Sequence, residues 1–165
     1  LRSQKFACEH PESSRTSMSL VLSAAARSLG GGCELLTIDT NFFILMNFSL
    51  DKRGVRAREI LKHIIQGDPA VTSSLALDEI MWIMLHNNQA SKMRAVISEV
   101  YRIRNLEIKR VSQLAPLRAL DFVENYNLKP RDALHASIME ELGIHKIVND
   151  DPDFDNIPGI KRIKL

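Results

Sequence analysis

Short apolar segments typical of buried β-strands alternate along this chain with longer segments of helical periodicity. The strand-like segments span residues 35–38, 70–72, 106–111, 144–148 and 160–163. The helical segments between them span residues 42–48, 57–65, 75–85, 93–100, 115–126 and 130–142. Short, almost wholly apolar strands that alternate with helices predict a parallel sheet covered on both faces. We therefore expect an α/β fold, a three-layer α/β/α sandwich around a short central parallel sheet.

The length of 165 residues suits one domain preceded by an extension. Residues 1–33 are rich in Ser and Ala, contain a triple glycine at residues 30–32 and show no sustained periodicity. We expect them to form a tail that is poorly ordered or a single helix, and residues 34–165 to form one catalytic domain. The tail also accounts for the net charge of +2, since residues from Cys33 onward carry 18 basic and 18 acidic side chains. Bulk charge therefore gives no argument for binding nucleic acid.

The two cysteines, Cys8 and Cys33, do not form a Cys-x-x-Cys pair, which argues against a zinc site. Two scattered thiols fit a reducing compartment, so we expect a cytoplasmic protein. No apolar run reaches the roughly 18 residues that span a membrane, and we expect no membrane association.

Acidic side chains follow the strand-like segments. Asp39 comes directly after the first, and a run of acids from Asp150 to Asp155 follows the fourth. Glu79 lies on the helix after the second strand, and Asp132 lies in the first turn of the helix that Pro130 begins. In a parallel sheet these positions share the edge where ligands bind. Clustered carboxylates raise one another's pKa unless a cation neutralises them, and oxygen ligands select Mg²⁺ or Mn²⁺ over zinc.

The segments that contain these acids resemble those of PIN domains, and specifically of VapC-like toxin ribonucleases. The resemblance is carried by residues 38–41 (Ile-Asp-Thr-Asn), 77–80 (Leu-Asp-Glu-Ile), 129–136 (Lys-Pro-Arg-Asp-Ala-Leu-His-Ala) and 149–155 (Asn-Asp-Asp-Pro-Asp-Phe-Asp). It covers about residues 34–165. The family's four acidic positions map onto Asp39, Glu79, Asp132 and Asp151. Asp151 is preferred to Asp150 and Asp153 because the family places its last acid three residues before a phenylalanine, here Phe154.

The resemblance implies an endoribonuclease that depends on Mg²⁺ (or Mn²⁺), acts as the toxin of a toxin–antitoxin pair and forms a homodimer. Asp39, Asp132 and Asp151 would hold the ion, and Glu79 would ligate it too or hold the attacking water. Thr40 and Asn41 would orient Asp39 by hydrogen bonds, and Asn149 and Asp153 would support the acids of the last loop. Asn149 departs from the family, which often has Ser or Thr there.

Several basic residues have two interpretations. Arg131 can contact an RNA phosphate or balance the acids, and Lys52 and Arg53 can guide RNA or belong to a solvated helix face. His135, one turn after Asp132, can be a general acid, but a packed histidine is the favoured interpretation. His63, His86 and His145 carry no spacing signal.

Six consecutive apolar residues, 80–85, cover every direction of a helix rather than one stripe. One side must face the sheet, which leaves apolar surface elsewhere, and monomers rarely expose such a patch. We expect Trp82, Ile83 and Met84 to contact an antitoxin segment or a second copy of the chain; the alternative is that neighbouring elements bury the whole helix.

Two other classes of function remain open from the sequence. One is a receiver-type phosphoacceptor domain, which also gathers acids and Mg²⁺ at strand ends but normally has an acidic pair where Asp39 is followed by Thr40. The other is a PIN-like module that binds RNA or protein without cleaving RNA. The complete acidic set favours the nuclease.

Overall fold

The computed structural model describes residues 34–165, so the predicted tail lies outside the described residues. Five short strands form one sheet in the order β3-β2-β1-β4-β5, and every neighbouring pair is parallel. The strands are β1 (Leu36–Ile38), β2 (Ala70–Ser73), β3 (Leu106–Lys109), β4 (Lys146–Val148) and β5 (Lys161–Ile163). The chain leaves β1 toward β2 on one side and later returns to pair β4 with its other side. This reversal puts a ligand-binding position at the carboxyl end of β1.

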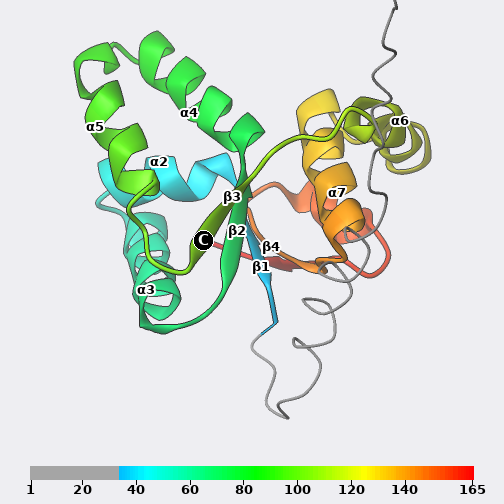
Figure 1. Ribbon diagram of the computed structural model, residues 1–165, viewed down its shortest axis with the longest axis horizontal. Helices are drawn as coiled ribbons and strands as arrows, with labels where there is room; N and C mark the ends of the chain where they lie inside the picture. The colour runs from blue at the N-terminus through cyan, green and yellow to red at the C-terminus, as the bar shows by residue number, and fades with distance from the viewer. Residues whose placement is uncertain (1–33) are drawn as a thin grey trace, which may run out of the picture. The chain divides into compact units, whose positions relative to one another are not determined.

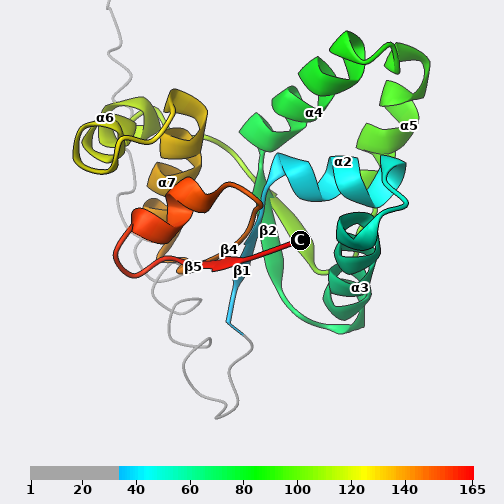
Figure 2. The same cartoon turned by 180° about the vertical axis from the view of Figure 1, so that it is seen from behind.

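Helices cover both faces of the sheet (Figures 1 and 2). One layer contains α2 (Thr40–Phe48), α3 (Lys52–Gln66), α4 (Ser74–His86) and α5 (Ala90–Val100). The opposite layer contains α6 (Ala115–Tyr126) and α7 (Pro130–Leu142), with the 3₁₀ helix η1 (Pro152–Asn156) on the same side. The expected three-layer α/β/α sandwich with a short parallel sheet is confirmed.

The core is divided by the sheet, as this layering requires. Ile38, Phe42 and Ile80 belong to one buried cluster, and Ile147, Met139 and Phe154 belong to the other. Successive strand residues point to opposite faces, so Val148 packs in the first cluster and Ile147 in the second. Apolar residues are therefore needed on both faces of β4, which is why the strand lacks the alternation of a half-exposed one.

Local sequence signals begin and end the helices that carry the acids. The Ser73 side chain accepts a hydrogen bond from the Ala76 N–H and caps α4. Pro130 occupies the first turn of α7, where its missing N–H costs no hydrogen bond. Gly143 ends α7 in the left-handed region with a φ of 64°. These signals fix where Glu79 and Asp132 stand relative to the strand ends.

Candidate active site

Asp39 stands at the centre of the candidate site. It follows β1, occupies the N-cap position of α2 and is 5% exposed. Its own N–H donates to the Val148 carbonyl oxygen of β4 at 3.4 Å, so a hydrogen bond joins the carboxyl ends of β1 and β4. Burial raises the pKa of Asp39, although His135 and the backbone N–H groups of Thr40 and Asn41 oppose that shift.

Glu79 lies on α4, the helix that follows β2, and its side chain approaches the start of α2 beside Asp39. The Thr40 hydroxyl donates to Glu79 Oε2 at 2.5 Å, and His135 Nε2 lies 3.2 Å from the same oxygen. Burial on its own would raise the pKa of Glu79, but the hydrogen bonds from His135 and Thr40 outweigh it and lower the pKa. Glu79 is therefore held ionised and in one orientation.

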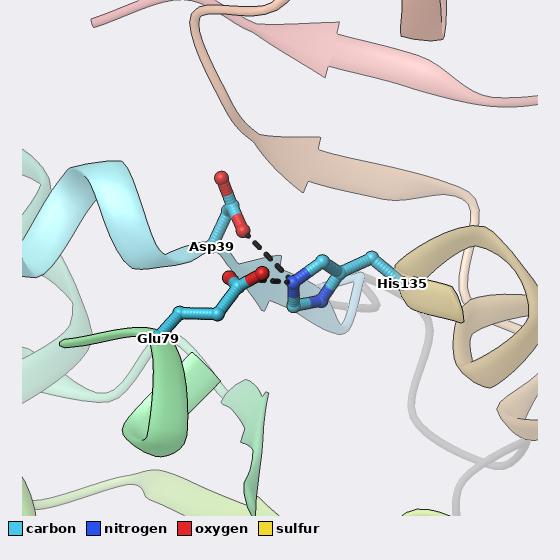
Figure 3. Close-up of side chains that lie close together, drawn as sticks. All are labelled: Asp39, Glu79 and His135. Atoms are coloured by element: carbon cyan, nitrogen blue, oxygen red, sulfur yellow. Dashed lines mark hydrogen bonds and ion pairs between the residues drawn. The ribbon is translucent and has the colours of Figure 1, made fainter. Parts of the chain in front are cut away.

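His135 connects the two acids. Its Nε2 lies 3.3 Å from Asp39 Oδ1 as well as 3.2 Å from Glu79 Oε2, and Figure 3 shows the imidazole directed at both carboxylates. Ligand atoms of these three buried residues all lie within 4.8 Å of one another. Burial works against protonation of His135, but Glu79 and Asp39 reverse this and raise its pKa.

Asp132 and Asp151 complete the acidic set on the open side. Together with Asp39 and Glu79 they line a cavity of about 580 Å³, whose other walls are Thr40, Asn41, Trp82, Ile83, Lys129, Pro130 and Arg131. Burial, followed by the charges of Asp151 and Asp39, raises the pKa of Asp132 to about 6. The pKa of Asp151 is lowered by the Asp153 N–H and, against some burial, by Lys129.

The donor set of this cavity fits a hard divalent cation. Four carboxylates supply oxygen ligands, the type that Mg²⁺ and Mn²⁺ prefer. After burial, the charges of Asp151 and Asp39 contribute most to the raised pKa of Asp132, so the negative charge around it is incompletely balanced. A cation held there would remove that imbalance.

A sequence profile comparison decides the family. Residues 36–160 match the family described as "PIN domain", and this range includes every strand end that carries an acid.

The chain belongs to the PIN domain family.

Proteins similar to this PIN domain include a sequence relative named as a ribonuclease and solved structures with the same fold. Ribonuclease VapC13 from Mycobacterium tuberculosis is 26% identical over 137 residues, which cover 78% of this chain and 99% of the relative. The crystal structure of VapC20 from the same organism, described as a "Sarcin-Ricin loop cleaving toxin", superposes with a TM-score of 0.62 at 16% identity, covering 73% of this chain and 92% of that one. A toxin–antitoxin complex from Klebsiella pneumoniae gives a TM-score of 0.56 at 23% identity, covering 76% and 95%. The predicted resemblance to VapC-like PIN domains is confirmed.

The supporting polar residues lie near the acids, with one difference from expectation. We expected the Thr40 side chain to orient Asp39, but its hydroxyl binds Glu79 instead, because α4 brings Glu79 next to the first turn of α2. Asn149 is buried, and its Oδ1 accepts the Asp151 N–H at 2.5 Å, so it shapes the loop that carries Asp151. Asp153 donates its own N–H to Asp151 Oδ1 at 3.0 Å.

The expected RNA-contacting residues fall into two groups. Arg131 lines the cavity, where its Nε lies 3.5 Å from Glu79 Oε1 and its guanidinium lies over the Trp82 ring at 5.4 Å. Lys52 and Arg53 begin α3 and are exposed, outside the residues that line this cavity. Arg53 pairs with Asp51 and, at 3.5 Å, with Asp150.

The apolar run on α4 is partly exposed. Trp82 is 50% exposed and lies beside the cavity together with Ile83. Met84 lines a second cavity beside α4, but it is only 1% exposed and belongs to the core. The reason is helical geometry: Met84 lies one turn after Ile80, on the face that packs against the sheet.

Two residues of the site were given too little weight from the sequence. His135 was interpreted as a packed histidine, and it is buried, but it is buried against Asp39 and Glu79. The available signal was its spacing of three residues from Asp132, which puts both on one face of α7. For Lys129, the available signal was its position directly before the helix turn that carries Asp132, which puts it in the cavity wall.

The shifted pKa values predict how metal-free stability depends on pH. The pKa of Asp132 rises from 3.8 to about 6 on folding, and that of His135 is raised above 6.5. Both groups bind their protons more tightly in the folded protein, so the free energy of unfolding should fall as the pH rises from 5 to 8. Thermal unfolding followed by circular dichroism in EDTA should show a melting temperature that declines by several degrees over this range. With excess Mg²⁺ the decline should shrink; an EDTA curve that rises toward pH 8 would contradict this assignment.

Proposed function

We propose that this PIN domain is a divalent-metal-dependent endoribonuclease that hydrolyses RNA phosphodiester bonds. The observation that carries the proposal is the convergence of four carboxylates from separate segments on one open cavity. The name of the 26% identical relative, a ribonuclease, supports the same activity.

Four acids would hold Mg²⁺ or Mn²⁺: Asp39, Glu79, Asp132 and Asp151. When bound, such an ion acidifies water and offsets the negative charge that develops on the phosphodiester. Asp39 is fixed by the strand end and by its place at the start of α2, and Asp151 is fixed through Asn149. Preorganisation of this kind lets charged groups act without rearranging during the reaction.

Glu79 is suited to orient the attacking water. Its Oε2 is engaged by Thr40 and His135, whereas its Oε1 lies 3.5 Å from Arg131 at the cavity. One oxygen is thus held by the protein core and the other is directed toward the substrate side. Arg131 is placed to contact a phosphate that enters the cavity.

Metal removal tests this proposal. Purified protein is incubated with a structured RNA in Mg²⁺, in EDTA, and in EDTA followed by excess Mg²⁺. We expect cleavage in Mg²⁺, its loss in EDTA and its recovery on adding Mg²⁺ back. RNA binding without cleavage in any condition would favour a PIN-like binding module, and labelling of Asp39 by a small phosphodonor would favour a receiver domain.

The apolar surface beside α4 is the proposed docking site for an antitoxin. Ile44, Phe48 and Ile83 line a second cavity of about 310 Å³ between α2 and α4. Trp82 and Leu85 are further exposed apolar residues of α4. A solved structure with the same fold is a toxin–antitoxin complex, which supports a protein partner here. By the same likeness we propose that the chain acts as a toxin, forms a homodimer and works in the cytoplasm.

Polar substitutions in this surface should weaken the partner without affecting the nuclease. Phe48 and Leu85 are 40% and 57% exposed, and neither lines the carboxylate cavity. Phe48→Ser combined with Leu85→Ser should lower affinity for the proposed antitoxin by at least about tenfold, since apolar anchors dominate such interfaces. Calorimetry measures the affinity, and light scattering reports whether the dimer persists.

The control is Leu117→Ser, which changes an equally exposed leucine on α6, in the opposite helix layer. Its antitoxin affinity should match that of the wild type. If the double variant also binds normally and remains folded, the docking site lies elsewhere.

A further inference from the structure

Two cations at the candidate active site are paired with acids that are proposed to hold metal. Lys129 Nζ lies 2.9 Å from Asp151 Oδ2 and 3.6 Å from Asp153 Oδ2. Arg131 Nε lies 3.5 Å from Glu79 Oε1. Both cations line the same cavity as Asp132. In the metal-free protein they therefore partly neutralise the acidic set.

Lys129 is the more exposed of the two cations. Its side chain is 67% exposed, against 49% for Arg131, and its ammonium pairs with Asp151 and Asp153. Arg131 is additionally placed over the Trp82 ring, which restricts its guanidinium. A lysine ammonium on a flexible stem can change partners at little energetic cost, because an exposed ion pair contributes little to stability.

The pairing of Lys129 competes with metal binding. Asp151 Oδ1 already accepts the Asp153 N–H, so Oδ2 is the oxygen least committed to the backbone, and Lys129 is bonded to it. The same oxygen cannot fully serve an ammonium and a divalent cation, and the two positive charges repel each other. Once Asp151 is used for metal, Lys129 keeps only its longer contact, 3.6 Å to Asp153 Oδ2.

We propose that Lys129 exchanges partners: it pairs with Asp151 in the metal-free protein and binds an RNA phosphate in the metal-loaded protein. This rests on the proposed metal-dependent nuclease function. The exchange couples the two ligands, because metal binding releases the cation that the phosphate requires. Lys129 thus positions the substrate and lowers the affinity of the site for metal.

The proposal predicts opposite effects on the two ligands. Lys129→Ala should bind Mn²⁺ about twofold to fivefold more tightly, since the competing cation is gone. The same variant should bind RNA about fivefold more weakly in the presence of metal, through loss of one phosphate contact. In EDTA its RNA affinity should match that of the wild type. A purely structural role would weaken both ligands or neither.

Titration calorimetry with Mn²⁺ alone measures the first effect. Fluorescence anisotropy measures the second, with a 5′-fluorescein-labelled single-stranded RNA of 12 mixed nucleotides in Ca²⁺ or EDTA; a denaturing gel checks that the probe stays intact. Lys129→Arg keeps the charge and should behave as the wild type in both assays. The matched control is Lys146→Ala, which removes a lysine paired with Glu34 at the amino end of β4.

The outcomes separate this inference from the function on which it rests. If the wild-type protein neither binds Mn²⁺ nor cleaves RNA, the proposed function is wrong. Wild-type protein that does both, with a Lys129→Ala variant whose Mn²⁺ affinity is unchanged or weaker, overturns the exchange alone. Tighter Mn²⁺ binding together with weaker RNA binding, absent from Lys146→Ala, supports it.

Discussion

Replacing Asp39 by asparagine is expected to reduce RNA cleavage by at least about 100-fold, equivalent to about 3 kcal/mol of transition-state stabilisation. The substitution keeps the shape of the side chain and removes its negative charge. Asp39 lies 3.3 Å from His135 and lines the cavity that also contains Asp132 and Asp151, so the lost charge is central to the acidic set. Cleavage of the RNA used for the wild type, measured at saturating Mg²⁺, checks this result.

The same variant should not be less stable without metal. Burial raises the pKa of Asp39, which means that its charged form is disfavoured in the folded protein at neutral pH. Asparagine avoids that penalty, so in EDTA the melting temperature should be unchanged or higher. Mg²⁺ should stabilise the wild type and have little effect on the variant.

Asp78→Asn is the matched control. Asp78 is an exposed acid on α4, directly before Glu79, and it lies outside the residues that line the cavity. It should keep wild-type cleavage and the Mg²⁺-dependent rise in melting temperature. Equal activity in the Asp39 and Asp78 variants would exclude Asp39 from the chemistry.

The fold was predictable because local sequence and global packing agree. Short apolar strands between amphipathic helices leave few alternatives to a covered parallel sheet, and each strand appears where the sequence places it. One strand is shorter than predicted: the sequence predicts a strand over residues 106–111, but β3 ends at Lys109. β3 is an edge strand, and its partner β2 ends at Ser73 in register with Lys109, so there is nothing further to pair with.

The approximate position of the acids was predictable for a related reason. Carboxyl ends of parallel strands share one edge, so Asp39 and the loop after β4 had to approach each other. Side-chain partners were not predictable in the same way. Whether Thr40 faces Asp39 or Glu79 depends on how close α4 lies to α2, which no local pattern encodes. The burial of Met84 follows from helix rotation, which a run of six apolar residues leaves undetermined.

His135 gives the largest expected effect on stability. His135→Leu should lower the free energy of unfolding in EDTA by about 3 kcal/mol, because it leaves two buried carboxylates without their shared donor. Asp39 and Glu79 lie 3.3 and 3.2 Å from the imidazole, which is 3% exposed. Leucine has a similar volume, so the loss reports electrostatics rather than a cavity. Chemical denaturation with constant m-values measures it.

Metal should distinguish this electrostatic loss from a packing defect. A divalent cation between the acids supplies the positive charge that His135 provides, so Mg²⁺ should restore part of the lost stability. His135→Gln, whose amide can still donate to one carboxylate, should lose less than the leucine variant. Because His135 has a raised pKa, the advantage of the wild type over His135→Leu should be largest near pH 6 and shrink as the pH rises through the pKa of the folded protein. A loss that is independent of both pH and Mg²⁺ would show that the histidine acts by packing alone.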